Sequence, residues 1–385
     1  MWLGACTSSI GTWMQNLAQS WLVYELTKSA WYLGLDAFLG QIPIFLFSML
    51  GGVVADRKDR RKILVVSQVV QMSCAVTLAT VAFLGVVQVW HVLLLSFTVG
   101  VAQAFGGPAY QAMIPTLVKK EDLQNAIAMN SIQFNVARVI GPTIGGITLA
   151  KFGATWCFAL NALSFVAVIF TLLRVAPRPP AMTAKEPVIE SMKTGLRFIR
   201  DHATMGGLVV LAFLMTLLGV PIMTFLPVVA ERVFHLGKEA YSTMLVVSGI
   251  GSVVGGFLVA ATSQAKRKGM LSLAALAALG ALIFGFGVST NVYVACTMLF
   301  FGGAALIACF GLVSSLVQSL TEDSMRGRVM SVYNVAFRGG MPFGAFAAGK
   351  LIESYSAPQV LAVNGLLLMV LSAVFWFTQR KVARL

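Results

Sequence analysis

Long apolar runs, separated by short polar segments, follow one another along almost the whole chain. A helix needs roughly 20 apolar residues to cross a bilayer. Twelve stretches fit this pattern: 2–24, 31–55, 63–86, 91–113, 123–150, 155–175, 206–230, 239–262, 270–289, 291–320, 329–353 and 358–378. Gly and Pro inside several stretches are tolerated, because neighbouring helices can satisfy the freed backbone groups. The pattern predicts an all-α membrane protein with twelve transmembrane helices.

The composition agrees with this prediction, since 58% of the residues are hydrophobic and only 11% are charged. A soluble domain carries about 25% charged residues, and a disordered chain has low hydrophobicity. The apolar run from Trp2 to Tyr24 is too long for the apolar region of a signal peptide, so we expect no cleavable leader.

The formal net charge of +14 reflects loop topology. If the N-terminus is cytoplasmic, 21 of the 28 Lys and Arg residues fall in inner segments and five in outer loops. The inner segments are 57–62, 119–120, 174–200, 266–268, 326–328 and the tail from Arg380. By the positive-inside rule, this bias predicts a protein of the cell's inner membrane with both termini cytoplasmic. It also argues against a nucleic-acid partner.

No motif indicates a cofactor, a metal ion or an enzyme. The cysteines Cys6, Cys74, Cys157, Cys296 and Cys309 lie in apolar stretches without a metal-binding spacing. A phosphate-binding GxxxxGK[ST] loop and an HExxH motif are absent from the sequence, and no nucleophile–base pair has suitable spacing. We therefore expect no cofactor, no metal site and no catalytic residues.

A Pro-rich segment divides the apolar stretches into two groups of six. Downstream of its prolines, Ile189, Met192, Leu196 and Ile199 share one helical face, which predicts an amphipathic helix on the inner membrane surface. The predicted organisation is an N-terminal six-helix bundle (1–175), a cytoplasmic linker (176–205) and a C-terminal six-helix bundle (206–385).

The two halves repeat one another. Residues 130–146 read NSIQFNVARVIGPTIGG, and residues 330–346 read MSVYNVAFRGGMPFGAF. At an offset of 200, Arg138 aligns with Arg338 and Pro142 with Pro342. Six plus six helices in the same orientation form the parallel repeat of one class of secondary transporter.

The loop at 52–62, GVVADRKDRRK, resembles the signature of the major facilitator superfamily, and GPTIGG (141–146) is similar to the GPxxGG motif of its antiporters. The segments 108–123 and 326–332 further resemble the branch with the enterobactin exporter and macrolide-efflux proteins. The resemblance implies transport by alternating access. The chain departs from the signature at Asp59, where the signature usually has Gly. The fourth predicted span lacks the Arg that many drug–proton antiporters of the superfamily carry, and the first predicted span has no acidic residue.

The resemblance also implies a cytoplasmic gate, in which Asp56 faces the helix that opens near Arg326 and Arg328. Gly52, Arg57 and Arg60 complete the loop part of this gate. The alternative is a plain positively charged inner loop.

Pairs of glycines four residues apart favour close helix packing. The pairs are Gly141/Gly145, Gly251/Gly255 and Gly340/Gly344, with Pro142 and Gly146 beside the first. We expect these residues to form gate-packing surfaces, and generic packing of membrane helices is the alternative.

Three charged residues lie inside predicted spans, away from the last few residues at either end. Arg138 and Arg338 each precede a proline by four residues, so the carbonyl of each arginine loses its helical donor. Each arginine either donates hydrogen bonds to neighbouring carbonyl groups or forms part of a positively charged cavity wall for anionic or phenolic groups. Asp36 is either the proton-coupling residue or a structural acid near the outer mouth.

Polar stripes within spans predict a cavity or interhelical hydrogen bonds, since polar groups that face lipid are costly. The candidate cavity residues are Thr12, Gln15, Asn16 and Gln19 in the first span, Gln103 and Gln111 in the fourth, and Ser314 in the tenth, with the apolar Phe310 nearby. A cavity that is polar on one side and apolar on the other suits an amphiphilic compound.

The sequence therefore predicts a monomeric secondary transporter in the lipid bilayer that exports a small amphiphilic molecule, a siderophore or a drug, in exchange for protons. The alternatives are an uncoupled facilitator or lipid-type carrier, and a non-transporting membrane sensor or scaffold.

Overall fold

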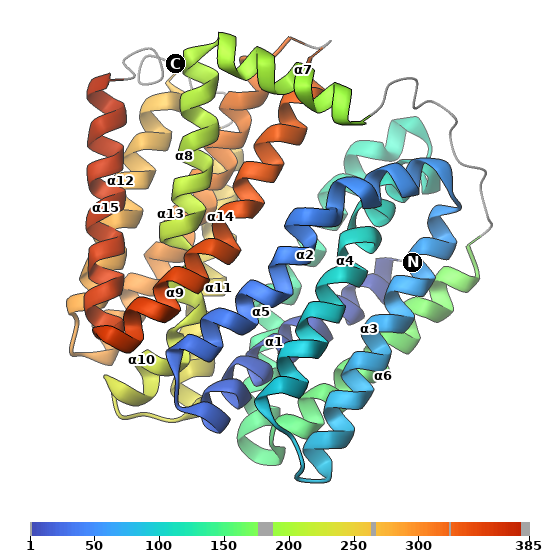
Figure 1. The fold of residues 1–385 in the computed structure, drawn as a ribbon, viewed down its shortest axis with the longest axis vertical. Coiled ribbons are helices and arrows are strands. Elements are labelled where there is room, and N and C mark those ends of the chain that lie inside the picture. The colour runs from blue at the N-terminus through green and yellow to red at the C-terminus, as the bar shows by residue number, and fades with distance from the viewer. Residues whose placement is uncertain (1, 176–187, 263–266, 323–324, 379–385) are drawn as a thin grey trace. The chain divides into compact units, whose positions relative to one another are not determined.

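The computed structural model describes residues 2–175, 188–262, 267–322 and 325–378, and within these ranges it contains helices and no strand (Figure 1). The first half comprises α1 (Trp2–Thr27), α2 (Ala30–Arg57), α3 (Arg60–Phe83), α4 (Val89–Leu117), the short 3-10 helix η1 (Lys120–Asp122), α5 (Leu123–Phe152) and α6 (Ala154–Leu173). The rest comprises α7 (Val188–Asp201), α8 (Ala203–Gly219), α9 (Pro221–Thr224), α10 (Leu226–Arg232), α11 (Lys238–Ala261), α12 (Lys268–Val288), α13 (Val292–Ser319), α14 (Arg326–Ser354) and α15 (Ala357–Thr378). The predicted all-α class is confirmed.

Nine of the helices in the described residues are long and apolar enough to cross a membrane, so the chain is a multi-pass membrane protein. Three further helices, α1, α5 and α14, are 26, 30 and 29 residues long and coincide with predicted spans. They do not count among the nine because no stretch within them is apolar enough. The number of twelve spans stays a prediction.

The predicted span 206–230 is not one continuous helix. The helical hydrogen bonding is interrupted between α8 and α9 at Val220, which keeps helical backbone angles, and the chain leaves the helical conformation between α9 and α10 at Phe225. Pro221 and Pro227 lie in the first turns of α9 and α10. A proline fits the first turn of a helix but disrupts a helix interior, so these two residues break the span.

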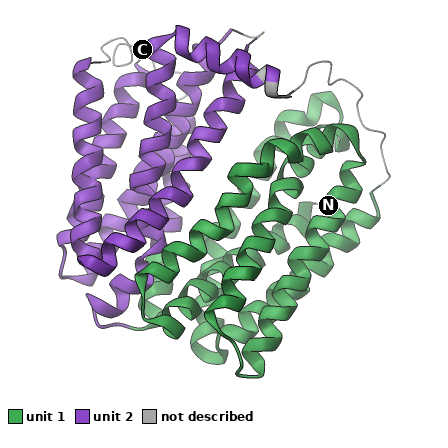
Figure 2. Cartoon of the chain, viewed as in Figure 1, with its two compact units in different colours: residues 1–185, 237–246 green, residues 186–236, 247–385 purple. Residues whose placement is uncertain are grey.

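The chain forms two compact units, coloured separately in Figure 2. Unit 1 comprises residues 1–185 and 237–246, and unit 2 comprises 186–236 and 247–385. The first part of α11 thus belongs to unit 1. Of the predicted linker, 176–187 lies outside the described residues. The amphipathic helix α7 packs on α14 within unit 2, where Gly195 faces the backbone carbonyl of Arg328.

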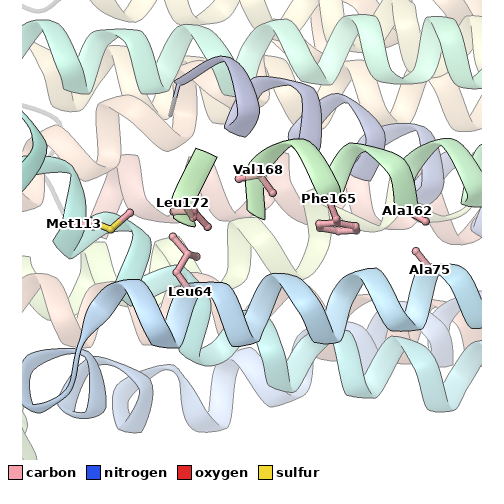
Figure 3. Packing of buried hydrophobic residues seen from close by; sticks show 7 residues of the cluster. All are labelled: Leu64, Ala75, Met113, Ala162, Phe165, Val168 and Leu172. Atoms are coloured by element: carbon pink, nitrogen blue, oxygen red, sulfur yellow. The ribbon is translucent and has the colours of Figure 1, made fainter. Parts of the chain in front are cut away.

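Within unit 1, α3, α4 and α6 enclose an apolar core. Its buried members include Leu64 from α3, Met113 from α4, and Phe165 and Leu172 from α6 (Figure 3). The close packing of these side chains also holds in place the polar residues that lie beside them on the same faces of α3 and α4.

Glycines bring α2 and α4 into backbone contact in unit 1. A methyl group added at Gly51 would meet the carbonyl oxygen of Ala104, and one at Gly100 would lie 2.6 Å from the carbonyl oxygen of Gly40. In unit 2, Gly251 and the carbonyl of Phe300 repeat this contact between α11 and α13.

The remaining predicted glycine pairs also lie in contacts inside one unit. Gly141 and Gly145 of α5 face α1, and Gly340 and Gly344 of α14 face α8. Gly255 faces Ala304, and Gly146 faces Ser242, whose hydroxyl donates to the carbonyl of Pro142 at 3.0 Å. These residues pack helices closely, and their role in a gate stays a prediction.

The contact at Gly51 predicts an asymmetry between two adjacent glycines. Gly51→Ala should lower the free energy of unfolding by about 1–3 kcal/mol, because the new methyl group clashes with a backbone carbonyl. Gly52→Ala is the control, since no atom lies within 4 Å of a methyl group added there. It should be neutral or stabilise the helix by up to about 1 kcal/mol. Equilibrium unfolding in mixed detergent micelles measures both, and equal losses would contradict the packing argument.

Candidate functional site

A buried carboxylate joins three helices of unit 1. Asp36 of α2 is 8% exposed. Gln19 of α1 donates from Nε2 to both carboxylate oxygens, at 3.2 Å and 3.0 Å, and Ser96 of α4 donates its hydroxyl to Oδ1 at 2.5 Å. The same Nε2 lies 2.9 Å from the Ser96 hydroxyl oxygen. Among the described residues, no Lys, Arg or His forms an ion pair with Asp36.

The partners of Asp36 suit a group that changes its protonation state. An amide and a hydroxyl can each donate to a carboxylate, and each also has an acceptor for the hydrogen of a carboxylic acid. A cationic partner would instead favour the ionised form alone. The cluster can therefore hold Asp36 with or without a proton.

A cavity of about 510 Å³ lies within unit 1. It receives residues from α1, α3, α4, α5 and α6, and three predicted cavity residues line it: Thr12, Gln103 and Gln111. The Nε2 atom of Gln103 donates to Oε1 of Gln71 at 2.9 Å. The structure thus brings together part of the polar stripes of the first and fourth spans.

The other predicted residues of α1 lie elsewhere. Gln15 is buried and accepts a hydrogen bond of 2.6 Å from Nδ2 of Asn161 on α6. Asn16 is exposed, and Gln19 belongs to the Asp36 cluster. Gln15 therefore occupies an interhelical hydrogen-bond seam of the kind that was the alternative to a cavity.

Arg138 lies among aromatic rings. Its guanidinium carbon is 5.4 Å from the ring centroid of Trp13 and 6.0 Å from that of Phe134, and these rings meet edge to face at 5.9 Å. The Nη1 atom is buried and has no hydrogen-bond partner among the described residues. Trp13 and Phe134 line the cavity, whereas Arg138 does not. The contacts that the structure shows for this side chain are with aromatic rings, and both predicted roles, bonding to carbonyls or forming the cavity wall, stay predictions.

The loop between α2 and α3 is held by its own charged residues. Arg60 donates to the carbonyls of Ala55 at 3.1 Å and Ala112 at 2.9 Å, and it lies 3.5 Å from a carboxylate oxygen of Asp56. Arg61 donates to the carbonyl of Leu173 at the end of α6 at 2.6 Å. A cation at the C-terminal end of a helix is electrostatically favourable.

Asp59, the departure from the loop signature, caps α3. Its Oδ1 accepts hydrogen bonds from the backbone N–H groups of Arg61 at 2.9 Å and Lys62 at 3.4 Å. Arg57 is exposed, and no atom lies within 4 Å of a methyl group added at Gly52. Arg326 and Arg328 lie at the start of α14, which belongs to unit 2, whereas the loop belongs to unit 1. The predicted contact between the loop and α14 therefore stays a prediction.

Comparisons with known proteins agree with this architecture. A family model described as a transmembrane secretion effector of the major facilitator superfamily matches residues 1–383. The chain belongs to this family. Enterobactin exporters from Escherichia coli O1:K1 and Shigella boydii serotype 18 are each 27% identical over 369 residues, which cover 93% of this chain and 87% of theirs.

Solved transporters have the same fold as this family member. A D-xylose–proton symporter matches with a TM-score of 0.80 and 14% identity, covering 97% of this chain and 96% of its own. A bacterial homologue of the human lysosomal transporter Spinster, in an inward-facing unoccupied conformation, matches with a TM-score of 0.77 and 16% identity, covering 99% and 96%. The relatives are transporters of the major facilitator superfamily, not enzymes. The described residues hold no cluster of three or more His, Cys, Asp or Glu able to bind a metal ion.

In unit 2 of this transporter, the predicted cavity residue Phe310 packs within a group of aromatic rings. Phe310 packs edge to face on Phe337 at 4.7 Å, and Phe337 stacks on Tyr333 at 6.1 Å. The hydroxyl of Ser314 accepts from Nε2 of Gln318 at 3.2 Å. Arg338 is more exposed than the aligned Arg138.

Several polar residues of the unit 1 cavity were missed from the sequence. Gln68 and Gln71 lie three residues apart on α3, and Asn130 and Gln133 have the same spacing on α5. Polar residues at this spacing share one face of a helix. That signal was present in both stretches, but it could not show that the two faces meet in one cavity.

The contacts of Arg60 predict a structural role that its neighbour Arg57 does not share. Arg60→Met should lower the free energy of unfolding by about 2 kcal/mol, because the carbonyls of Ala55 and Ala112 lose a charged donor. Arg57→Met, at an exposed position, should change it by less than about 0.5 kcal/mol. Unfolding of the purified protein measures both variants. A similar small effect for the two would show that the Arg60 bonds do not hold the loop.

Proposed function

We propose that this family member is a secondary active transporter that exports a small amphiphilic compound, a siderophore or a drug, in exchange for protons. The curated relatives at 27% identity carry the name enterobactin exporter, which supports export of a siderophore-like molecule. The cavity of unit 1 combines polar and aromatic side chains, and such a lining suits an amphiphile.

The observation that carries the proton coupling is the Asp36 cluster. A buried acid inside a membrane span is costly and most often functional. Asp36 has amide and hydroxyl partners that accommodate both of its protonation states, and a plain structural acid would gain more from a cationic partner. When the site opens to one side of the membrane and then the other, this acid takes up and releases one proton.

The transporter is expected in a bacterial-type inner membrane, with both termini cytoplasmic. The excess of Lys and Arg in the predicted inner loops supports this orientation. We expect it to work as a monomer in the lipid bilayer, with the substrate and protons as its only other partners.

Proteoliposomes with an imposed pH gradient test the coupling. Enterobactin, a macrolide and a lysophospholipid are supplied in turn, and substrate movement and internal pH are recorded together. Proton flux is expected with at least one compound. Asp36→Asn should abolish gradient-driven uphill movement while substrate exchange without a gradient continues, because the amide can still hydrogen-bond within the cluster but cannot ionise.

Asp59→Asn is the matched control, since it makes the same chemical change and Asn still caps a helix. It should leave coupled transport unchanged. Exchange without proton flux in the unmodified protein would indicate an uncoupled facilitator or lipid-type carrier and overturn the proposal. Equal loss of exchange and uphill transport in Asp36→Asn would identify Asp36 as a structural acid.

A further inference from the structure

A groove opens between α2 and α3 of unit 1, on the other side of α3 and α4 from the cavity. α4 lies between α2 and α3 and packs on both of them (Figure 1). Gly51 of α2 faces the carbonyl of Ala104, and the hydroxyl of Ser67 on α3 donates to the carbonyl of Ala102 at 2.7 Å. α2 and α3 hardly contact each other, so a space of about 470 Å³ remains with α4 as its floor. It shares no lining residue with the cavity.

The groove is apolar along most of its length and faces the bilayer. Its apolar lining comes from all three helices and includes Val54, Ile63, Val66, Val70, Val101 and Phe105. The side chain of Val66 is 62% exposed, which suits a position in contact with lipid. An empty groove would leave these walls without contacts on one side, so in a bilayer it is filled by hydrocarbon.

Two lysines lie at the end of the groove next to the α2–α3 loop. Lys58 directly follows α2, Lys62 lies in the first turn of α3, and both are exposed. Neither side chain forms an ion pair or a hydrogen bond with another described residue. Asp59 also lines this end, but its Oδ1 accepts hydrogen bonds from the backbone N–H groups of Arg61 and Lys62. The end of the groove therefore carries a net positive charge.

A second apolar groove shows that such a charge is not a general feature of the bilayer-facing surface. It has a volume of about 390 Å³ and lies between α8, α14 and α15 of unit 2, where Leu351 and Val363 are exposed. Among the described residues that line it, none is Asp, Glu, Lys, Arg or His. The basic end thus distinguishes the groove of unit 1 and calls for an anionic occupant.

The predicted orientation places this basic end at the cytoplasmic surface. Anionic lipids give the cytoplasmic leaflet its negative potential, and basic pockets between transmembrane helices on that side bind their headgroups. Hydrocarbon gains little from leaving one apolar environment for another, so the lysines and not the apolar walls would select the lipid.

The dimensions of the groove favour a lipid over a partner helix. From Lys62 to Val70 its α3 wall is about 12 Å long, at 1.5 Å per residue. Spread over this length, the volume of about 470 Å³ corresponds to a width of about 7 Å. A helix with its side chains is about 10–12 Å across and does not fit. A flexible acyl chain fits a space of this width.

We propose that this groove binds one anionic phospholipid, whose phosphate is held by Lys58 and Lys62 and whose acyl chain lies on α3 and α4. Lysine binds phosphate as a point charge, so two ammonium groups suffice without a rigid cage. The lipid is a resident of the groove and not the exported compound. The assignment goes beyond the proposed function and is independent of proton coupling.

Native mass spectrometry of the detergent-solubilised protein measures the affinity for the first bound lipid. The probes are dioleoyl phosphatidylglycerol, dioleoyl phosphatidylcholine, which has the same chains without net charge, and glycerol phosphate, which has no chain. Phosphatidylglycerol should bind about twentyfold more tightly than phosphatidylcholine, because two lysines attract it. Equal affinities for the two lipids would overturn the proposal. Displacement of the lipid by an equal concentration of glycerol phosphate would overturn it in favour of a site for free phosphate.

Paired charge variants test the headgroup contact. Lys58→Gln combined with Lys62→Gln should weaken phosphatidylglycerol about twentyfold and leave phosphatidylcholine unchanged. Lys119→Gln combined with Lys120→Gln is the matched control, since these lysines are exposed, lie outside the groove and remove the same charge. The control should change the affinity less than about twofold. Equal losses in the two pairs would show a general effect of charge and contradict the site.

A bulky residue in the groove tests the position of the acyl chain. Val101→Trp fills the floor and should weaken both lipids at least about fivefold. Val69→Trp is the control, because Val69 is exposed on α3 but does not line the groove. If Val101→Trp does not fold, Val66→Trp on the exposed wall gives the same test. Unchanged binding in the variant that folds would place the lipid elsewhere and refute the assignment.

Discussion

One constraint of the bilayer underlies the whole structure: a polar group inside it must find its partner within the protein. Within each helix the backbone groups bond one another, and glycines such as Gly51 of α2, which faces the carbonyl of Ala104, let neighbouring helices pack closely. Polar side chains pair across helices, as Gln15 does with Asn161. Among the described residues few buried polar side-chain atoms lack a hydrogen-bond partner, and the Oε1 of Gln68 is one of them.

The Asp36 cluster and the cavity of unit 1 draw on the same polar stripes. Ser96 and Gln103 are seven residues apart on α4, and Gln19 and Thr12 are seven apart on α1. At 1.5 Å per residue, each pair spans about 10 Å along its helix. Asp36 therefore lies one layer away from the cavity and does not need to touch a ligand. A change of its charge can act through Gln19 and Ser96, which are on the helices that also supply Thr12 and Gln103.

The sequence predicted the helical elements well because apolar length and loop charge dominate the behaviour of membrane segments. The stretch predicted at 123–150 became α5, Leu123–Phe152. The span predicted at 206–230 was divided because two prolines outweigh an apolar run, a local rule that the length criterion ignores. A polar stripe identified Gln103, and a charge inside a predicted span identified Asp36. No stripe could show that Gln19 turns toward Asp36 while Gln15 turns toward Asn161. The partner of each glutamine depends on which helix packs against it, and that arrangement is known only from the three-dimensional structure.

The internal repeat shows which of these features are common to both halves of the chain and which are found in one half. The α2–α4 contact at Gly51 recurs between α11 and α13 at Gly251, so the repeat preserved close packing. It did not preserve the chemistry of the aligned helices α5 and α14. At the offset that aligns Arg138 with Arg338, Gln133 of the cavity corresponds to Tyr333, which stacks on Phe337. At this position a hydrogen-bonding amide of unit 1 is replaced by an aromatic ring in unit 2. The repeat therefore preserved the helix contacts but not the side chains that line the unit 1 cavity.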